Sequence, residues 1–299
     1  QAQAGVRYEH ITSDYYEYGK RVEEQSRKYD HIFPSLVVSF PLGNVQMQLA
    51  YRASIKRPSY WDLRGNITYA NRYTYETGNP LLQPTTIQSL SLNTIYRWMS
   101  LSLSYNHYKN DYTSYVCAYS EENPTIGLLT REHLAPYNRL SASLMLSPVI
   151  GKWSPRWGVQ VQRYDCKVNT PQGVETFDNP LATLSWRNTV KFTDSFWINA
   201  DAYYQTKCQG ENMEYLKDSW YMNFNLYKGF MNDRMSLQLQ VSDLFNTRKS
   251  HVLMYSGLRT MELDNEMHRT VSLTFRYQFN PTKSKYKGTG AGQSQKARM

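Results

Sequence analysis

Residues 78–105 read GNPLLQPTTIQSLSLNTIYRWMSLSLSY, and this stretch decides the fold class. Its opening loop, residues 78–84, contains a glycine and two prolines, which do not continue a regular element. From Ser89 to Tyr96 apolar and polar residues then alternate, and the alternation resumes after residues 97–99. Successive side chains of an extended chain point to opposite faces. The stretch therefore predicts a β-hairpin with one apolar face and one polar face.

The same unit recurs along the chain and predicts an all-β, antiparallel up-and-down sheet of about twelve strands. The clearest of these strands is residues 45–55, VQMQLAYRASI. Every second connection is short, about three to nine residues, and those between run from about ten to thirty residues, an asymmetry typical of outer-membrane barrels. The pattern predicts a transmembrane β-barrel over residues 1–280, with about twelve strands in this chain. The first strand, Ala2 to Tyr8, is expected to be short and interrupted by Gly5.

The composition is rich in aromatic residues yet polar overall. The chain has 26 Tyr, 7 Trp and 10 Phe among 299 residues, with a mean hydropathy of −0.66. No run approaches the roughly eighteen apolar residues that a membrane helix requires, whereas a barrel spends only every second residue on lipid. Aromatic residues near the predicted strand ends fit an interfacial girdle; they are Tyr96, Trp98, Trp153, Trp157, Trp197 and Trp220.

Cysteine and charge content indicate neither a metal site nor a nucleic-acid surface. Cys117, Cys166 and Cys208 are widely spaced and have no clustered histidine partner, so we expect no metal and no cofactor. The net charge of +9 owes much to the last residues, 281–299, which predict a basic, flexible periplasmic tail. The body of the chain carries no contiguous basic stretch, which excludes nucleic acid as an expected partner.

Six short segments in order resemble one family. They are AGVRYE (4–9), YDHIFPSLVVSF (29–40), RPSYWDLRGNI (57–67), GNPLLQP (78–84), VSDLFNT (241–247) and FRYQF (275–279). Together they resemble the outer-membrane β-barrel family of Bacteroidetes, the C-terminal barrel portion of TonB-dependent receptors. The resemblance covers nearly the whole chain.

This resemblance implies a substrate-gated importer for an unidentified nutrient, driven through TonB–ExbB–ExbD. It also implies outer-membrane lipid and lipopolysaccharide, a plug domain and the barrel assembly machinery as partners. Such receptors have about 22 strands and an N-terminal plug, and this chain offers neither the remaining strands nor a plug candidate.

Charged residues on predicted polar faces are the candidate site. Arg52, Arg187, Asp201 and Arg276 fall there, where they are expected to line the lumen or to contact the plug, because lipid-facing charges are costly. The tyrosine-rich segments Ile11 to Lys28 and Tyr69 to Glu76 offer a second place for a ligand.

No arrangement of residues predicts an enzyme. The six histidines are expected in loops or at strand ends. Asp194 and Ser195 belong to a predicted three-residue turn, and the segments 78–80 and 243–246 are interpreted as a turn and a strand exit.

Three functions remain open: the receptor segment, a self-closed barrel acting as scaffold or passive pore, and, least supported, an outer-membrane hydrolase. For the bacterial outer membrane we expect long loops outside and both chain ends in the periplasm, which places Asn44 and Ser195 on the periplasmic side. We further expect that the segment expressed alone aggregates or opens.

Overall fold

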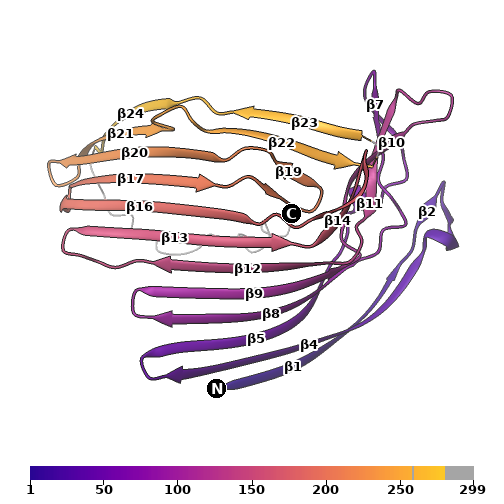
Figure 1. Ribbon diagram of the computed structural model, residues 1–299, viewed down its shortest axis with the longest axis horizontal. Helices are drawn as coiled ribbons and strands as arrows, with labels where there is room; N and C mark the ends of the chain where they lie inside the picture. Colours follow the sequence, from indigo (N-terminus) through magenta and orange to yellow (C-terminus); the bar gives the residue numbers. More distant parts are fainter. Residues whose placement is uncertain (258, 280–299) are drawn as a thin grey trace.

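Twelve antiparallel strands form one continuous sheet (Figure 1) in the computed structural model, which describes residues 1–257 and 259–279. Each strand between the two edge strands pairs with the one before and the one after it, so the predicted up-and-down order is confirmed. In order across the sheet the strands are β1 (Ala2–Ser13), β4 (Arg27–Leu42), β5 (Val45–Lys56), β8 (Thr85–Tyr96), β9 (Met99–Lys109), β12 (Tyr137–Leu146), β13 (Trp153–Tyr164), β16 (Leu181–Thr193), β17 (Phe196–Gln205), β20 (Ser219–Phe230), β21 (Met235–Ser242) and β24 (Thr270–Tyr277).

The register places like residues side by side on each face. One row across five neighbouring strands is apolar: Val38, Leu49, Leu92, Leu103 and Ala142. The row one residue away is polar: Ser39, Gln48, Asn93, Ser102 and Ser143. Because the side-chain period is two, a slip of one residue would exchange the two faces, so this pattern fixes the register.

The apolar face is not covered by any other layer of the described chain. Leu49 is 42% exposed and Leu273 is 67% exposed, and many other large apolar side chains lie open in the same way. Exposed apolar surface on this scale marks contact with a membrane or a partner. Among the described helices, none has the length and apolarity needed to cross a membrane.

The two ends of the sheet differ in their connections. Short turns lie at the left in Figure 1, at residues 43–44, 97–98, 147–152, 194–195 and 231–234. Three of these turns have only two residues, fewer than the three to nine that the sequence predicted. In these tight turns the strands stay paired up to the turn itself, where residues such as Gly43 and Arg97 adopt the positive φ that a two-residue turn requires. The turn predicted over residues 193–195 is one residue shorter in the structure, because Thr193 is the last residue of β16.

The long connections at the other end fold into small sheets where unstructured segments were expected. Each of the first two long segments contains one hairpin and one helical turn, and further hairpins belong to the later long segments (Figure 1). These elements are β2 (Tyr16–Glu17), β3 (Lys20–Arg21), η1 (Glu23–Gln25), α1 (Tyr60–Leu63), β6 (Thr68–Asn71), β7 (Thr74–Glu76), β10 (Tyr112–Ala118), β11 (Gly127–His133), β14 (Cys166–Thr170), β15 (Gly173–Phe177), β18 (Cys208–Gln209), β19 (Met213–Tyr215), β22 (Lys249–Ser256) and β23 (Arg259–Glu266).

The first strand is longer than the sequence indicates. The expected strand ended at Tyr8, but β1 pairs with β4 as far as Ser13 opposite Arg27. Alternation fades after Tyr8, and backbone hydrogen bonds continue without it because they do not depend on the side chains. The loop that was predicted to begin at Ile11 therefore begins at Asp14, after the end of β1.

Five of the six aromatic residues expected near strand ends lie there, and Trp157 is the exception, as the fifth residue of β13. Trp98 lies in a short turn, Trp153 is the first residue of β13, and Trp220 lies at the opposite end of the sheet, at the start of β20. Trp98 and Trp220 are 48% and 44% exposed. Rings half-embedded at strand ends suit a membrane interface. The predicted tail, residues 281–299, lies outside the described residues.

Candidate functional site

All four predicted site residues lie on the polar face of the sheet. Arg52 stands between Ser35 and Ser89, and Arg276 stands opposite Ser236. Arg187 and Asp201 are direct cross-strand neighbours, and Arg187 Nε donates a hydrogen bond of 3.2 Å to Asp201 Oδ1. The structure thus brings together two of the four residues, and leaves Arg52 and Arg276 on distant strands. Contact of any of them with a lumen ligand or a plug stays a prediction.

A third charged residue, Arg156, joins the pair and was missed in the sequence. It lies on β13 directly opposite Arg187, so the row across four strands is Arg156, Arg187, Asp201 and Asn223. The sequence did contain a sign of it. Trp153, Trp157 and Val159 occupy odd-numbered positions of the strand, so the even-numbered Arg156 must point to the opposite, polar face.

Two tyrosines form a wall beside this row. Tyr203 and Tyr221 are cross-strand partners on β17 and β20, with ring centroids 5.4 Å apart and planes 30° apart. Both line a cavity of about 250 Å³ that also contains Arg156, Arg187 and Asp201. They also line a second cavity of about 420 Å³, whose other side is formed by the segment that follows β21.

The segment after β21 is held by a buried aspartate. Asp243 is 3% exposed and has a positive φ of 51°. Its carboxylate accepts backbone hydrogen bonds from Thr247 at 2.9 Å and from Arg248 at 3.0 Å, and its own N–H donates to Asn223. The VSDLFNT segment is therefore a strand exit, as predicted, and it places the Arg248 guanidinium 4.5 Å from the Tyr221 ring centre.

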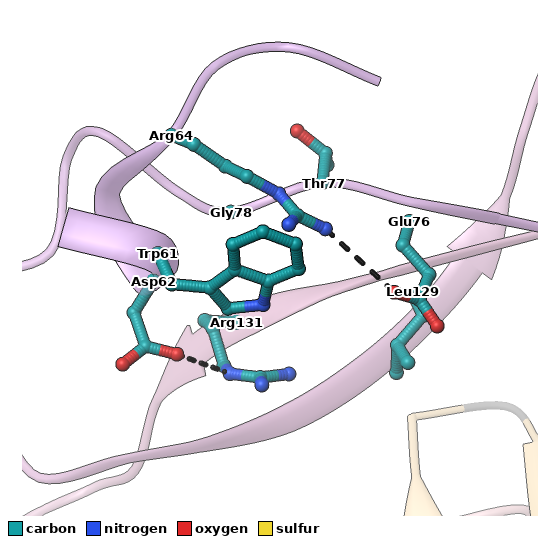
Figure 2. Close-up of a pocket in the computed structure, with 8 residues that line it drawn as sticks. All are labelled: Trp61, Asp62, Arg64, Glu76, Thr77, Gly78, Leu129 and Arg131. Carbon is teal, nitrogen blue, oxygen red and sulfur yellow. Dashed lines mark hydrogen bonds and ion pairs between the residues drawn. The ribbon is translucent and has the colours of Figure 1, made fainter. Parts of the chain in front are cut away.

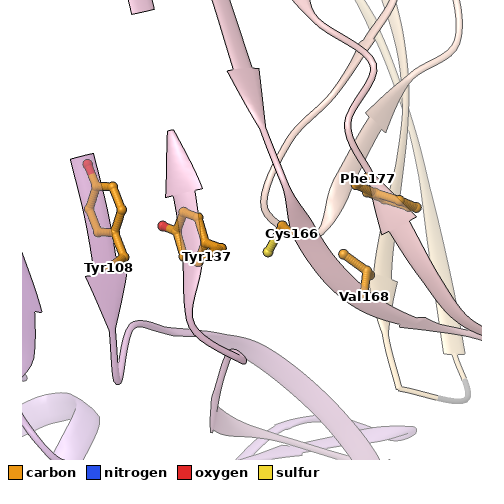
Figure 3. Close-up of a cluster of buried hydrophobic side chains, with 5 residues drawn as sticks. All are labelled: Tyr108, Tyr137, Cys166, Val168 and Phe177. Carbon is orange, nitrogen blue, oxygen red and sulfur yellow. The ribbon is translucent and has the colours of Figure 1, made fainter. Parts of the chain in front are cut away.

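A buried cluster joins the long segments to the sheet (Figure 3). Tyr108, Tyr137, Cys166, Val168 and Phe177 form it. Tyr108 and Tyr137 stack at 4.8 Å, and the Tyr137 hydroxyl lies 2.7 Å from Asp111 Oδ2 and 3.0 Å from Glu211 Oε1. A hydroxyl has one proton to donate, so these two carboxylates share a single donor.

The cysteines in this region are not activated. All three thiols are free. Burial, with the nearby carboxylates of Glu211, Asp165 and Asp111, raises the pKa of Cys166 to about 12, and burial raises the pKa of Cys208 to about 11. A thiol held protonated in this way is a poor nucleophile and a poor metal ligand.

A third, much smaller cavity of about 20 Å³ lies where the RPSYWDLRGNI and GNPLLQP segments meet (Figure 2). The Arg64 guanidinium lies 3.4 Å from the Trp61 ring centre, Arg131 Nε donates to Asp62 Oδ1 at 2.9 Å, and Glu76 lies 3.6 Å from Arg64. Two guanidiniums and two carboxylates balance each other here. The volume holds about one water molecule, so the cavity is a structural joint and offers no room for a solute.

Asp62 is the centre of this joint. Burial opposes its ionisation, but hydrogen bonds from Ser59 and Arg131 outweigh that effect and lower the pKa of its carboxyl. Asn79 reinforces the joint by donating to the Arg131 carbonyl at 2.9 Å and accepting from Leu81 N–H at 2.9 Å. The predicted turn at residues 78–80 is thus a turn with a clear structural role.

Histidines lie within strands more often than expected. His10, His31, His107 and His251 lie inside strands. His133 is the last residue of β11, a strand end as expected; its Nδ1 lies 3.1 Å from the Asn110 carbonyl oxygen and its Nε2 accepts from Gln83 N–H at 3.0 Å. His251 in β22 lies 2.9 Å from both Glu262 and Asp264 of β23, with the candidate ligand atoms within 4.8 Å of one another. These are cross-strand polar contacts of a hairpin, and sequence spacing gave no sign of them because the residues come from two strands.

Comparisons with known proteins agree with this architecture. A family model described as the outer membrane protein beta-barrel family matches residues 1–277. The siderophore receptor PirA of Acinetobacter baumannii superposes with a TM-score of 0.53 and 14% identity, over 84% of this chain and 41% of that one. A mutant of the ferric enterobactin receptor PfeA of Pseudomonas aeruginosa gives 0.54 and 15%, over 82% of this chain and 40% of that one.

This chain therefore spans about two fifths of the length of those receptors. At such low identity the likeness concerns the fold. No curated protein sequence matches the chain significantly.

Proposed function

Because this chain belongs to the outer membrane protein beta-barrel family, we propose that its sheet forms part of the wall of a TonB-dependent receptor that imports a nutrient. The observation that carries the proposal is the overlap of 82–84% of the chain with about 40% of two siderophore receptors. One of those proteins is a siderophore receptor and the other is a ferric enterobactin receptor. For this chain the nutrient is left open.

The edges of the sheet support a larger wall. Within the described residues, β1 pairs only with β4, and β24 pairs only with β21. Each free edge carries unpaired backbone groups, and in hydrocarbon every such group costs several kcal/mol. A barrel of about 22 strands would supply partners for both edges.

The polar face supports a filled or solvated interior. Arg52, Arg187, Asp201 and Arg276 lie on it, and in the proposed receptor they contact the plug or line the solute path. Energy would reach the plug through TonB–ExbB–ExbD. The apolar face would contact outer-membrane lipid and lipopolysaccharide after insertion by the barrel assembly machinery.

Uptake measurements in cells test this function. A strain that lacks the protein and a strain that lacks TonB should lose uptake of the same nutrient from a panel of labelled solutes, and the defect should not be additive in the double mutant. Uptake that depends on the protein but persists without TonB would instead identify a passive pore. The absence of any uptake defect would favour a scaffold.

A further inference from the structure

On the polar face two neighbouring cavities share the Tyr203–Tyr221 wall; one contains the Arg156–Arg187 pair, the other is lined by Arg248, and we call the two together the groove. We propose that this groove binds a small ring compound that carries a carboxylate group. The proposal rests on the proposed function, since it requires that this face line the interior of the barrel. Three separate features of the groove lead to this class of ligand.

The first feature is an excess of positive charge at one end. Arg156 and Arg187 are directly opposite each other, and like charges in this position destabilise a sheet. Asp201 compensates Arg187 alone. In the part of the chain that the structure describes, Arg156 forms no ion pair with a carboxylate. A ligand carboxylate between the two guanidiniums would relieve this repulsion, and the planar guanidinium fork matches that group.

The second feature is the shape of the space beside the arginines. The next row of the polar face begins with Gly158 and Ser185, and a Cβ at Gly158 would lie only 2.5 Å from Ser185 Oγ. Gly158 has no side chain and Ser185 a small one, which leaves space above the sheet, and the larger Tyr203 and Tyr221 rings lie next to that space. The resulting cavity of about 250 Å³ suits a single ring lying against an aromatic wall.

The third feature is a second cation at the far side of the tyrosines. The Asp243 carboxylate accepts hydrogen bonds from the backbone N–H groups of Thr247 and Arg248, and among the described residues the Arg248 guanidinium forms no ion pair with a carboxylate. Arg248 instead covers the Tyr221 ring. The groove thus has a cation on either side of its aromatic wall, which favours an anionic ligand over a neutral one.

Binding to the intact protein, purified from the outer membrane in detergent, tests the proposal. The probes are benzoate, its neutral counterpart benzamide, and acetate, which has the charge without the ring. Saturation-transfer NMR should detect benzoate at the protein, and titration should give a dissociation constant for it at least about tenfold below those of benzamide and acetate.

Variants then locate the site. Arg156→Gln should weaken benzoate binding about tenfold or more. Arg163→Gln is the matched control, because Arg163 is on the same strand but on the opposite face, where it pairs with Asp178 at 2.7 Å; its benzoate affinity should equal that of the wild type. Arg248→Gln should also weaken benzoate binding, which covers the case in which Arg156→Gln fails to fold.

Each other result overturns the proposal. No benzoate binding, equal binding of benzoate and acetate, or equal losses in Arg156→Gln and Arg163→Gln would each exclude a ring-carboxylate site. No benzoate binding would also be the result if an acidic side chain from elsewhere in the receptor occupied the arginines. None of these results alters the TonB-dependent uptake described above, so failure of the groove and failure of the proposed function are distinguishable.

Discussion

The backbone N–H of Asn79 donates a hydrogen bond of 2.6 Å to the carbonyl oxygen of Asp62, and this contact closes the joint between two long segments. Between these residues lies Gly78, whose Cα faces the carbonyl oxygens of Asp62 and Arg64. Only a residue without a side chain fits this approach.

Gly78→Ala should therefore destabilise the protein. The added Cβ would lie 2.7 Å from the Arg64 carbonyl oxygen, and overpacking of this kind costs about 1–3 kcal/mol. Gly210→Ala is the control, because the nearest atom to its Cβ is 3.8 Å away, and its unfolding midpoint in urea should match the wild type. Equal midpoints for both variants would contradict the role given to Gly78.

The Asp62–Arg131 joint should open at acid pH. The pKa of Asp62 is lowered in the folded protein from 3.8, so its ionisation stabilises the fold above that value, and this contribution is lost as the pH falls through the folded pKa. Pepsin, which is active across this range, should begin to cut residues 57–84 below about pH 4.

Asp62→Asn should weaken the pH dependence of that cleavage, because the group that titrates is gone. Asp178→Asn, which removes an exposed ion pair with Arg163, should be cleaved by pepsin with the same pH dependence as the wild type. Cleavage of the wild type that is independent of pH between 5 and 2, with pepsin activity corrected by a peptide standard, would show that Asp62 does not hold the joint.

The apolar face should face lipid. Leu49 lies mid-strand between Val38 and Leu92, so Leu49→Arg should cost about 2–4 kcal/mol of folding free energy near the bilayer midplane. Gln48→Arg, on the polar face between Ser39 and Asn93, should cost little. Folding titrations into lipid vesicles measure both values, and equal costs would count against a membrane barrel.

Labelling of intact cells should place the short turns in the periplasm. Asn44→Cys lies in a short turn and should stay unlabelled by a membrane-impermeant maleimide, whereas Tyr60→Cys, in the long segment 57–84 where Tyr60 is 93% exposed, should react. Cys117→Ser removes the half-buried native thiol, and Cys166 and Cys208 are buried. Strong labelling at position 44 with none at position 60 would reverse the orientation.

Residues 1–299 expressed alone should aggregate or open. The free edges of β1 and β24 expose backbone groups that have no partner among the described residues. Heat-modifiable migration on a gel after refolding in detergent, together with conductance in planar bilayers, measures the result. A compact, protease-resistant monomer with a reproducible single-channel conductance would favour the self-closed pore instead.

The sequence by itself determined the strands and their faces. Alternation such as that of residues 45–55 has a period of two, and only an extended strand with one side in an apolar medium requires that period. The same alternation put Arg52, Arg187, Asp201 and Arg276 on the polar face, where the structure has them. Local backbone geometry and solvent preference suffice for these conclusions.

Only the tertiary structure decided what meets across the chain. Arg131 reaches Asp62 over 69 residues, and Arg248 covers Tyr221 because a buried turn at Asp243 redirects the backbone. The small sheets of the long segments could not be predicted from the sequence either. Outside the membrane a strand can have water or protein on both faces, so its residues need not alternate between apolar and polar. The docking of the long segments depends on contacts between residues far apart in the chain, which no local pattern encodes.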